Sequence, residues 1–152
     1  MKNLSVANEL VVSYVKNPNL NIDDFKVVNN SRLMNVVFKQ IWNQNDLTIR
    51  ESFYAIFFNP KLDVVGYRKI GDGSVDAVMV DMRIIFSSAL LANATHIAVA
   101  HNHPSGSLKP SSADLNLTQQ IVSASKVLNI SFLDHLIITE DDYYSFRDEG
   151  NI

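Results

Sequence analysis

The sequence predicts an α/β fold, a mixed sheet flanked by helices, and three observations carry this prediction. Two strand-like segments, 50–59 and 64–70, surround a turn and are typical of an antiparallel pair. A small, apolar, β-branched segment at 94–101 is typical of a buried central strand. Helical segments lie on both sides of that strand along the chain, and the length of 152 residues favours a single core.

The N-terminal region is predicted to be a short helical extension. Residues 4–16 carry apolar positions at close to helical period. The segment "FKVVN" (25–29) is short and β-branched, which indicates a strand. Ser31 is expected to cap a helix over "RLMNVVFKQIW". Because polar "NQND" then separates this piece from the rest, we predict an extension at 1–45 and the main domain at 46–152.

The main domain is predicted to run strand, strand, helix, strand, helix, strand. Asp81 is expected to cap a helix over 82–93. A second helix is expected over about 112–128, because apolar residues recur along one of its faces. The segment "ISFLDHLIIT" (130–139) is typical of a strand, and "YYSF" (143–146) of a short final strand.

Composition narrows the classes of function. The formal net charge is −3, and Lys and Arg are scattered without a basic run, which disfavours strong, autonomous nucleic-acid binding. No apolar run approaches the roughly 20 residues that a membrane-spanning helix needs. The chain has no cysteine, which excludes disulfides and thiolate metal ligands. This composition fits a reducing cytoplasm, where we expect the protein to act, with no membrane partner.

The segment "AHNHPSGSLKPSSAD" carries the clearest indication of chemistry. His101 and His103 are two positions apart, so their side chains are expected to point to the same side. They fall at the carboxyl end of the predicted central strand, where α/β folds place ligand sites. Asp114 falls in the first turn of the next helix and can face that strand end. Two imidazoles and a carboxylate make a ligand set that leaves the fourth position of a zinc ion for water.

Each part of this segment also has a purely structural interpretation. Ser111-Ser112-Ala113-Asp114 matches a capping box, with a serine at the N-cap and an acid three residues later. Histidines at strand ends are commonly hydrogen-bonded rather than bound to metal. Two imidazoles crowded beside a carboxylate must nevertheless be paired to avoid a burial cost. The residues alone leave metal binding and simple capping both open.

The spacing His101-Asn-His103-Pro104, six residues, Ser111, two residues, Asp114 resembles the His-x-His-Pro…Ser-x-x-Asp signature of JAMM (MPN-type) metalloproteases. The surrounding "LDHLII" and "YYSFRDEG" resemble the RadC branch of that family, and the resemblance covers about residues 48–152. It implies a curved mixed sheet flanked by helices, similar to the cytidine-deaminase architecture. It also implies that Zn²⁺ is the cofactor and that His101, His103 and Asp114 hold it.

The resemblance implies two catalytic residues. Glu51 matches the family's general base, which takes a proton from the attacking water and passes it to the leaving amine. Its structural alternative is a solvated strand end. Ser111 matches the serine that stabilises the oxyanion of the tetrahedral intermediate. Asp134 and His135 either orient metal ligands or are satisfied within a strand, so we leave them outside the catalytic set.

Three functions follow as alternatives. The first is a zinc metallopeptidase or isopeptidase that acts on a protein or peptide. The second is a DNA-repair or recombination accessory that binds nucleic acid directly or through a partner. Proteins of the RadC type resemble a fusion with an N-terminal helix-hairpin-helix region, but residues 1–45 show no Gly-containing hairpin between paired helices. The third is a metal-stabilised interaction module without turnover. A homo-oligomer is compatible with all three.

Overall fold

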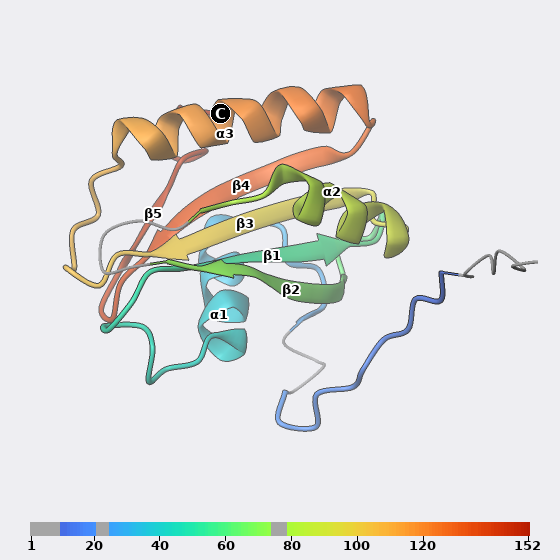
Figure 1. Cartoon of the computed structure of the whole chain (residues 1–152), viewed down its shortest axis with the longest axis horizontal. Coiled ribbons are helices and arrows are strands. Elements are labelled where there is room, and N and C mark those ends of the chain that lie inside the picture. The colour runs from blue at the N-terminus through green and yellow to red at the C-terminus, as the bar shows by residue number, and fades with distance from the viewer. Residues whose placement is uncertain (1–9, 21–24, 74–78) are drawn as a thin grey trace, which may run out of the picture.

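A five-stranded mixed sheet is the centre of the fold, and helices cover both of its faces (Figure 1). The computed structural model describes residues 10–20, 25–73 and 79–152. In chain order the elements are α1 (Ser31–Ile41), β1 (Ser52–Phe58), β2 (Val64–Asp72), α2 (Met82–Leu91), β3 (His96–Asn102), α3 (Ser112–Val127), β4 (Ser131–Ile138) and β5 (Tyr143–Ser145). The predicted α/β fold with a mixed sheet and flanking helices is confirmed.

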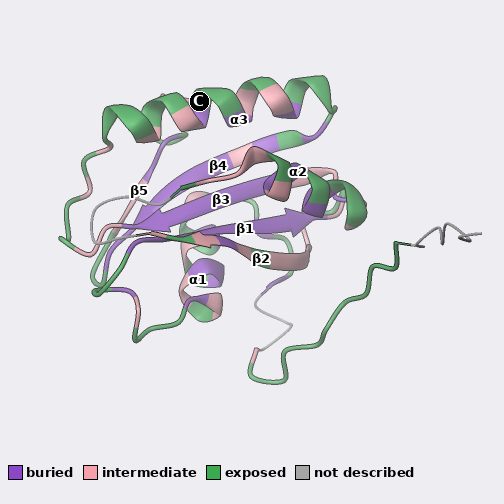
Figure 2. Cartoon of the chain, viewed as in Figure 1, coloured by how far each residue is buried: buried purple, intermediate pink, exposed green. Residues whose placement is uncertain are grey.

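The strand order is β2-β1-β3-β4-β5, so β3 is central. Strands β1 and β2 pair antiparallel, as the sequence predicts, with Ile56 opposite Tyr67. Strand β3 pairs antiparallel with β1 and parallel with β4, and helix α3 connects the two parallel strands. Strand β3 is buried along nearly its whole length (Figure 2), which explains its small and β-branched residues.

Helix α1 packs on one face of the sheet. Its buried residues Met34, Val37 and Phe38 share one apolar cluster with residues of β1, β3 and β4. Trp42, which follows the helix, lies against Tyr54 with ring centroids 4.4 Å apart. The region predicted as an extension therefore contributes to the core of the sheet, while the boundary drawn between residues 45 and 46 stays a prediction.

Helices α2 and α3 cover the opposite face (Figure 1). Ile85 and Phe86 of α2 and Ile121 of α3 pack with alternate residues of β1 and β3. Asp81 caps α2 as predicted, because its side chain accepts a hydrogen bond from the backbone N–H of Arg83. Over the ranges that the structure describes, none of the helices has the length and apolar character of a membrane span.

The predicted helix over 4–16 is wrong for residues 10–16, which have no regular secondary structure, while residues 4–9 lie outside the described part. The apolar side chains of this segment are exposed, and Val15 is 92% accessible. A helix in a protein is stabilised mainly by packing of its apolar face, and this segment has little packing. Tyr14 is its main anchor, with a hydroxyl that donates to the Ala92 carbonyl at 3.2 Å.

The predicted strand at 25–29 is also wrong. Val27 has a φ of 51°, in the left-handed region that interrupts a strand. Its N–H donates to the Asp63 carboxylate, and the N–H of Val28 donates to the Leu62 carbonyl. The apolar residues of this segment therefore enter the core from an irregular chain that is tied to the β1–β2 turn.

The helix that follows is capped by Asn30, so the prediction of Ser31 as the N-cap is wrong by one residue. Asn30 has extended dihedral angles, and its side chain accepts from the Leu33 N–H at 2.9 Å. Ser31 is already helical, and its hydroxyl donates to Asp148 instead. Both residue types cap helices well, so the backbone conformation decides between them.

Candidate metal centre

The two histidines meet at the carboxyl end of β3. His101 is 1% exposed, and Phe53 of the neighbouring strand stacks on its ring at a centroid distance of 6.1 Å. His103 lies just beyond the strand, where its backbone N–H donates to the Ile138 carbonyl. Their Nε2 atoms are 3.0 Å apart, so both rings present the same nitrogen to one point.

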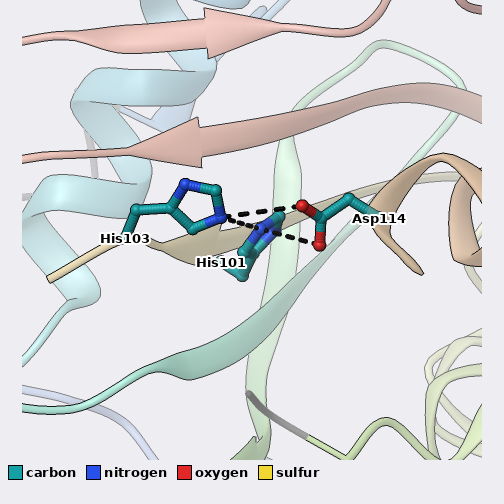
Figure 3. Close-up of side chains that lie close together, drawn as sticks. All are labelled: His101, His103 and Asp114. Atoms are coloured by element: carbon teal, nitrogen blue, oxygen red, sulfur yellow. Dashed lines mark hydrogen bonds and ion pairs between the residues drawn. The ribbon is translucent and has the colours of Figure 1, made fainter. Parts of the chain in front are cut away.

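Asp114 brings a carboxylate to that point from the first turn of α3 (Figure 3). Its Oδ1 lies 3.2 Å from Nε2 of His101, and its Oδ2 lies 3.6 Å from Nε2 of His103. The predicted capping box is also present: Ser111 Oγ accepts from the Asp114 N–H, and Oδ2 of Asp114 accepts from the Ser111 N–H at 2.7 Å. The helix cap therefore holds the carboxylate towards the histidines.

The donor set fits a divalent cation. Nδ1 of His103 lies 2.7 Å from the Ser107 carbonyl, which can only accept, so Nδ1 carries the hydrogen. In the neutral ring, Nε2 of His103 then has a free lone pair. The ligand atoms of His101, His103 and Asp114 all lie within 4.8 Å of one another. Lone pairs and a carboxylate that converge in this way suit zinc, with an open position for water.

His103 and Asp114 shift the pKa of one another. The hydrogen bond to Asp114 raises the pKa of His103 above its ordinary value. Burial alone would raise the pKa of Asp114, but its close contacts with His101 and His103 outweigh burial and hold that pKa far below its usual range. These shifts reflect how closely the two imidazoles and the carboxylate converge.

Glu51 lies directly before β1 and is 7% exposed, so the interpretation as a solvated strand end is wrong. It lines the same pocket as His101, His103 and Asp114. Its charge also contributes to the raised pKa of His103. Its backbone carbonyl accepts from the Gly73 N–H at 2.8 Å, which ties this residue to the end of β2.

The pocket has a volume of about 800 Å³. Phe53, Val80 and Leu117 form an apolar part of its lining, and Ser111 lies at its exposed side. The five residues singled out from the sequence are thus brought together in one cavity. Its apolar wall and convergent polar groups are typical of a ligand site.

His135 and Thr118 also lie at the site. The sequence leaves open whether His135 in β4 orients a metal ligand or is satisfied within a strand, and its Nε2 lies 2.8 Å from Nδ1 of His101. Its Nδ1 lies 2.7 Å from Thr118 Oγ1. Burial and the neighbouring His101 lower the pKa of His135 well below its ordinary value, so the ring is neutral. Thr118 is one helical turn after Asp114, the single local signal that it could reach the site.

The hydrogen bonds of Asp134 lie within the fold, which agrees with its interpretation as a strand residue with satisfied polar atoms. Its carboxylate accepts from the Ser145 hydroxyl at 2.5 Å and from the Arg147 N–H at 3.1 Å. It therefore fixes β5 and the turn that follows. Phe146, the next residue after β5, stacks on His135 with ring centroids 4.5 Å apart.

Comparison with known proteins agrees with the motif. The RadC-like JAB domain family matches residues 27–151. A UPF0758 protein of Flavobacterium johnsoniae is 43% identical over 66% of this chain and 44% of its own length. One from Protochlamydia amoebophila is 38% identical over 83% of the chain and 53% of its own length. The chain thus spans about half the length of these relatives. The resemblance found in the sequence is confirmed: this chain belongs to the RadC-like JAB domain family.

Proposed function

We propose that this protein is a zinc-dependent hydrolase of peptide or isopeptide bonds. The observation that carries the proposal is the convergence of two imidazole nitrogens and a carboxylate in a pocket that also contains a buried glutamate. His101, His103 and Asp114 would hold the metal. When bound, zinc lowers the pKa of a water at its open position to about 7 and polarises a carbonyl.

Glu51 is the proposed general base. A general base must lie within reach of the proton that it takes, and Glu51 lines the pocket onto which the three ligands face. It takes a proton from the attacking water and delivers that proton to the leaving amine.

Ser111 is the proposed oxyanion donor. Its Oγ accepts from the Asp114 N–H, and a hydroxyl that accepts can still donate its own hydrogen. The serine is also held at the N-terminus of α3, where the helix dipole favours negative charge. Capping and oxyanion stabilisation are therefore compatible in one side chain.

A protein or peptide is the proposed substrate. Phe53, Val80 and Leu117 offer an apolar surface beside the polar centre, which suits a side chain next to the scissile bond. The net charge of −3 gives no electrostatic support for a nucleic-acid substrate. The cytoplasm remains the proposed location.

The test combines metal analysis with a cleavage screen. Purified wild-type protein is expected to bind about one zinc per chain and to cleave members of a library of peptides and isopeptide-linked peptides. Glu51→Gln should keep the zinc and lose about 10²–10⁴-fold in turnover. Glu140→Gln makes the same chemical change at an exposed position and should behave as wild type. A folded, zinc-loaded Glu51→Gln variant that cleaves as well as wild type would remove the general-base assignment.

A further inference from the structure

A chain of three hydrogen bonds links two of the candidate ligands behind the site. From His101 it runs through His135 to the hydroxyl of Thr118. From there it returns to the backbone carbonyl of Asp114 at 2.7 Å. The chain thus begins and ends at two candidate ligands, and the carboxylate of Asp114 faces Nε2 of His101 at 3.2 Å.

We propose that His135 and Thr118 are positioning residues that hold His101 as the Nδ1–H tautomer, with the Nε2 lone pair directed into the metal site. The inference rests on the proposed metal-dependent function and assigns roles to two residues that contact candidate ligands but would not contact the metal. Neither residue reacts. They act only through the ring of His101.

The carbonyl of Asp114 fixes the direction of every hydrogen bond in the chain. A carbonyl only accepts, so Thr118 must donate its single hydroxyl hydrogen to it. Thr118 Oγ1 can then only accept from Nδ1 of His135, which makes His135 an Nδ1–H tautomer. Nε2 of His135 is therefore an acceptor, and Nδ1 of His101 must donate to it. The remaining nitrogen of His101 is left with its lone pair.

Reversing the hydrogen bond between Thr118 and His135 would cost free energy inside the protein. If Thr118 donated to His135, its oxygen would lie 2.7 Å from the Asp114 carbonyl oxygen with no hydrogen between them. Thr118 and His135 are both fully buried, so water does not relieve that contact. The favoured direction instead leaves three acceptors facing one another, Nε2 of His101, Nε2 of His103 and the Asp114 carboxylate. That arrangement is completed by a cation between them.

Thr118→Val and Thr118→Ser form the matched test pair. Valine keeps the shape and removes the hydroxyl, so His135 loses the partner that sets its tautomer. His101 is then expected to turn to the Nε2–H form and donate to Asp114. Zinc affinity, measured by competition with a chelator, should fall about 10–100-fold, the usual range for the loss of a group that orients a ligand. Thr118→Ser should keep both the tautomer and the affinity.

The tautomers can be read directly from long-range ¹H–¹⁵N spectra of the histidine rings, with and without zinc. His135→Gln and His135→Leu give a second pair, since glutamine keeps an acceptor for His101 and leucine does not. Wild type with an Nε2–H His101, or Thr118→Val with unchanged tautomer and unchanged zinc affinity, would overturn the inference. Protein that binds no zinc but shows the expected tautomers would instead count against the proposed function alone.

Discussion

Among single residues, His103 connects the stability of the fold to the protonation of the site. Its pKa is raised by the hydrogen bond to Asp114, so the folded state binds that proton more tightly than the unfolded chain. By linkage, this contribution to stability is complete below the unfolded pKa of about 6.5 and is lost as pH rises through the higher, folded value. The contribution of His135 to stability changes with pH in the opposite direction. Burial lowers its pKa, so below about pH 6.5 the unfolded chain binds a proton that the folded ring does not, and the folded state is destabilised.

The raised pKa of His103 gives a prediction that the difference between wild type and one variant isolates. In the presence of a chelator, the free energy of unfolding of wild type minus that of His103→Gln should decrease as pH is raised above about 6.5. Urea unfolding between about pH 6 and 8.5 measures it. Parallel curves for wild type and His103→Gln would contradict the charge assignment.

Asp134 is predicted to matter for folding and not for the metal. Its carboxylate accepts from Ser145 and Arg147 in a buried setting, and each donor left unsatisfied costs about 1–3 kcal/mol. Asp134→Ala should therefore lower the free energy of unfolding by at least about 2 kcal/mol, measured by urea unfolding. Asp141→Ala, at an exposed position, is the control. Zinc affinity that falls with Asp134→Ala while the fold remains intact would contradict this separation.

At the scale of elements, local chemistry explains which boundaries could be predicted. Asp81 and Ser111 cap their helices through side-chain bonds that span only two or three residues, so the sequence is sufficient to find them. Whether Asn30 or Ser31 is the N-cap of α1 depends on which of them has extended backbone angles, and residue type alone does not decide this. The apolar residues at 10–16 have helical spacing but little to pack against, and periodicity does not report that.

The N-terminus of α3 offers a way to separate capping from catalysis. Ser111→Ala should lower the free energy of unfolding by about 1 kcal/mol, whereas Ser111→Gly should cost only a few tenths, because glycine is tolerated at an N-cap. Both variants remove the proposed oxyanion donor, so both should lose about 10²–10³-fold in turnover on a substrate found in the cleavage screen. Thermal unfolding and kcat measured together test this. Loss of turnover that tracks stability across the two variants would leave Ser111 as a cap alone.

In the whole molecule, the site combines parts that are far apart in the chain. Glu51 comes from the start of β1, the histidines from the end of β3 and Asp114 from the start of α3. The His-x-His and Ser-x-x-Asp spacings are local, which is why the ligand set could be predicted. The hydrogen bonds that link His101, His135 and Thr118 could not be predicted from the sequence. They depend on the parallel register that sets His135 opposite Val99, two residues before His101.

Helix α1 packs on the face of the sheet opposite α2 and α3, where it contacts the strand that follows Glu51. Phe38 is fully buried in the cluster that also holds Tyr54, Ile56 and Phe58 of β1, the strand that follows Glu51. Phe38→Ala is expected to lower the free energy of unfolding by about 3–5 kcal/mol, the range for removing a buried aromatic ring. Val36→Ala removes an exposed side chain from the same helix and should change it by less than about 0.5 kcal/mol.

The shape of the unfolding transition decides what α1 is. If residues 31–42 share one core with the sheet, urea unfolding of Phe38→Ala should remain a single transition at a lower midpoint, by fluorescence of Trp42 and by circular dichroism alike. An extension that docks separately would instead lose its Trp42 signal first and leave the sheet transition unchanged. The first outcome follows from the packing of Trp42 against Tyr54, because a probe within the core reports the same event as the strands it touches.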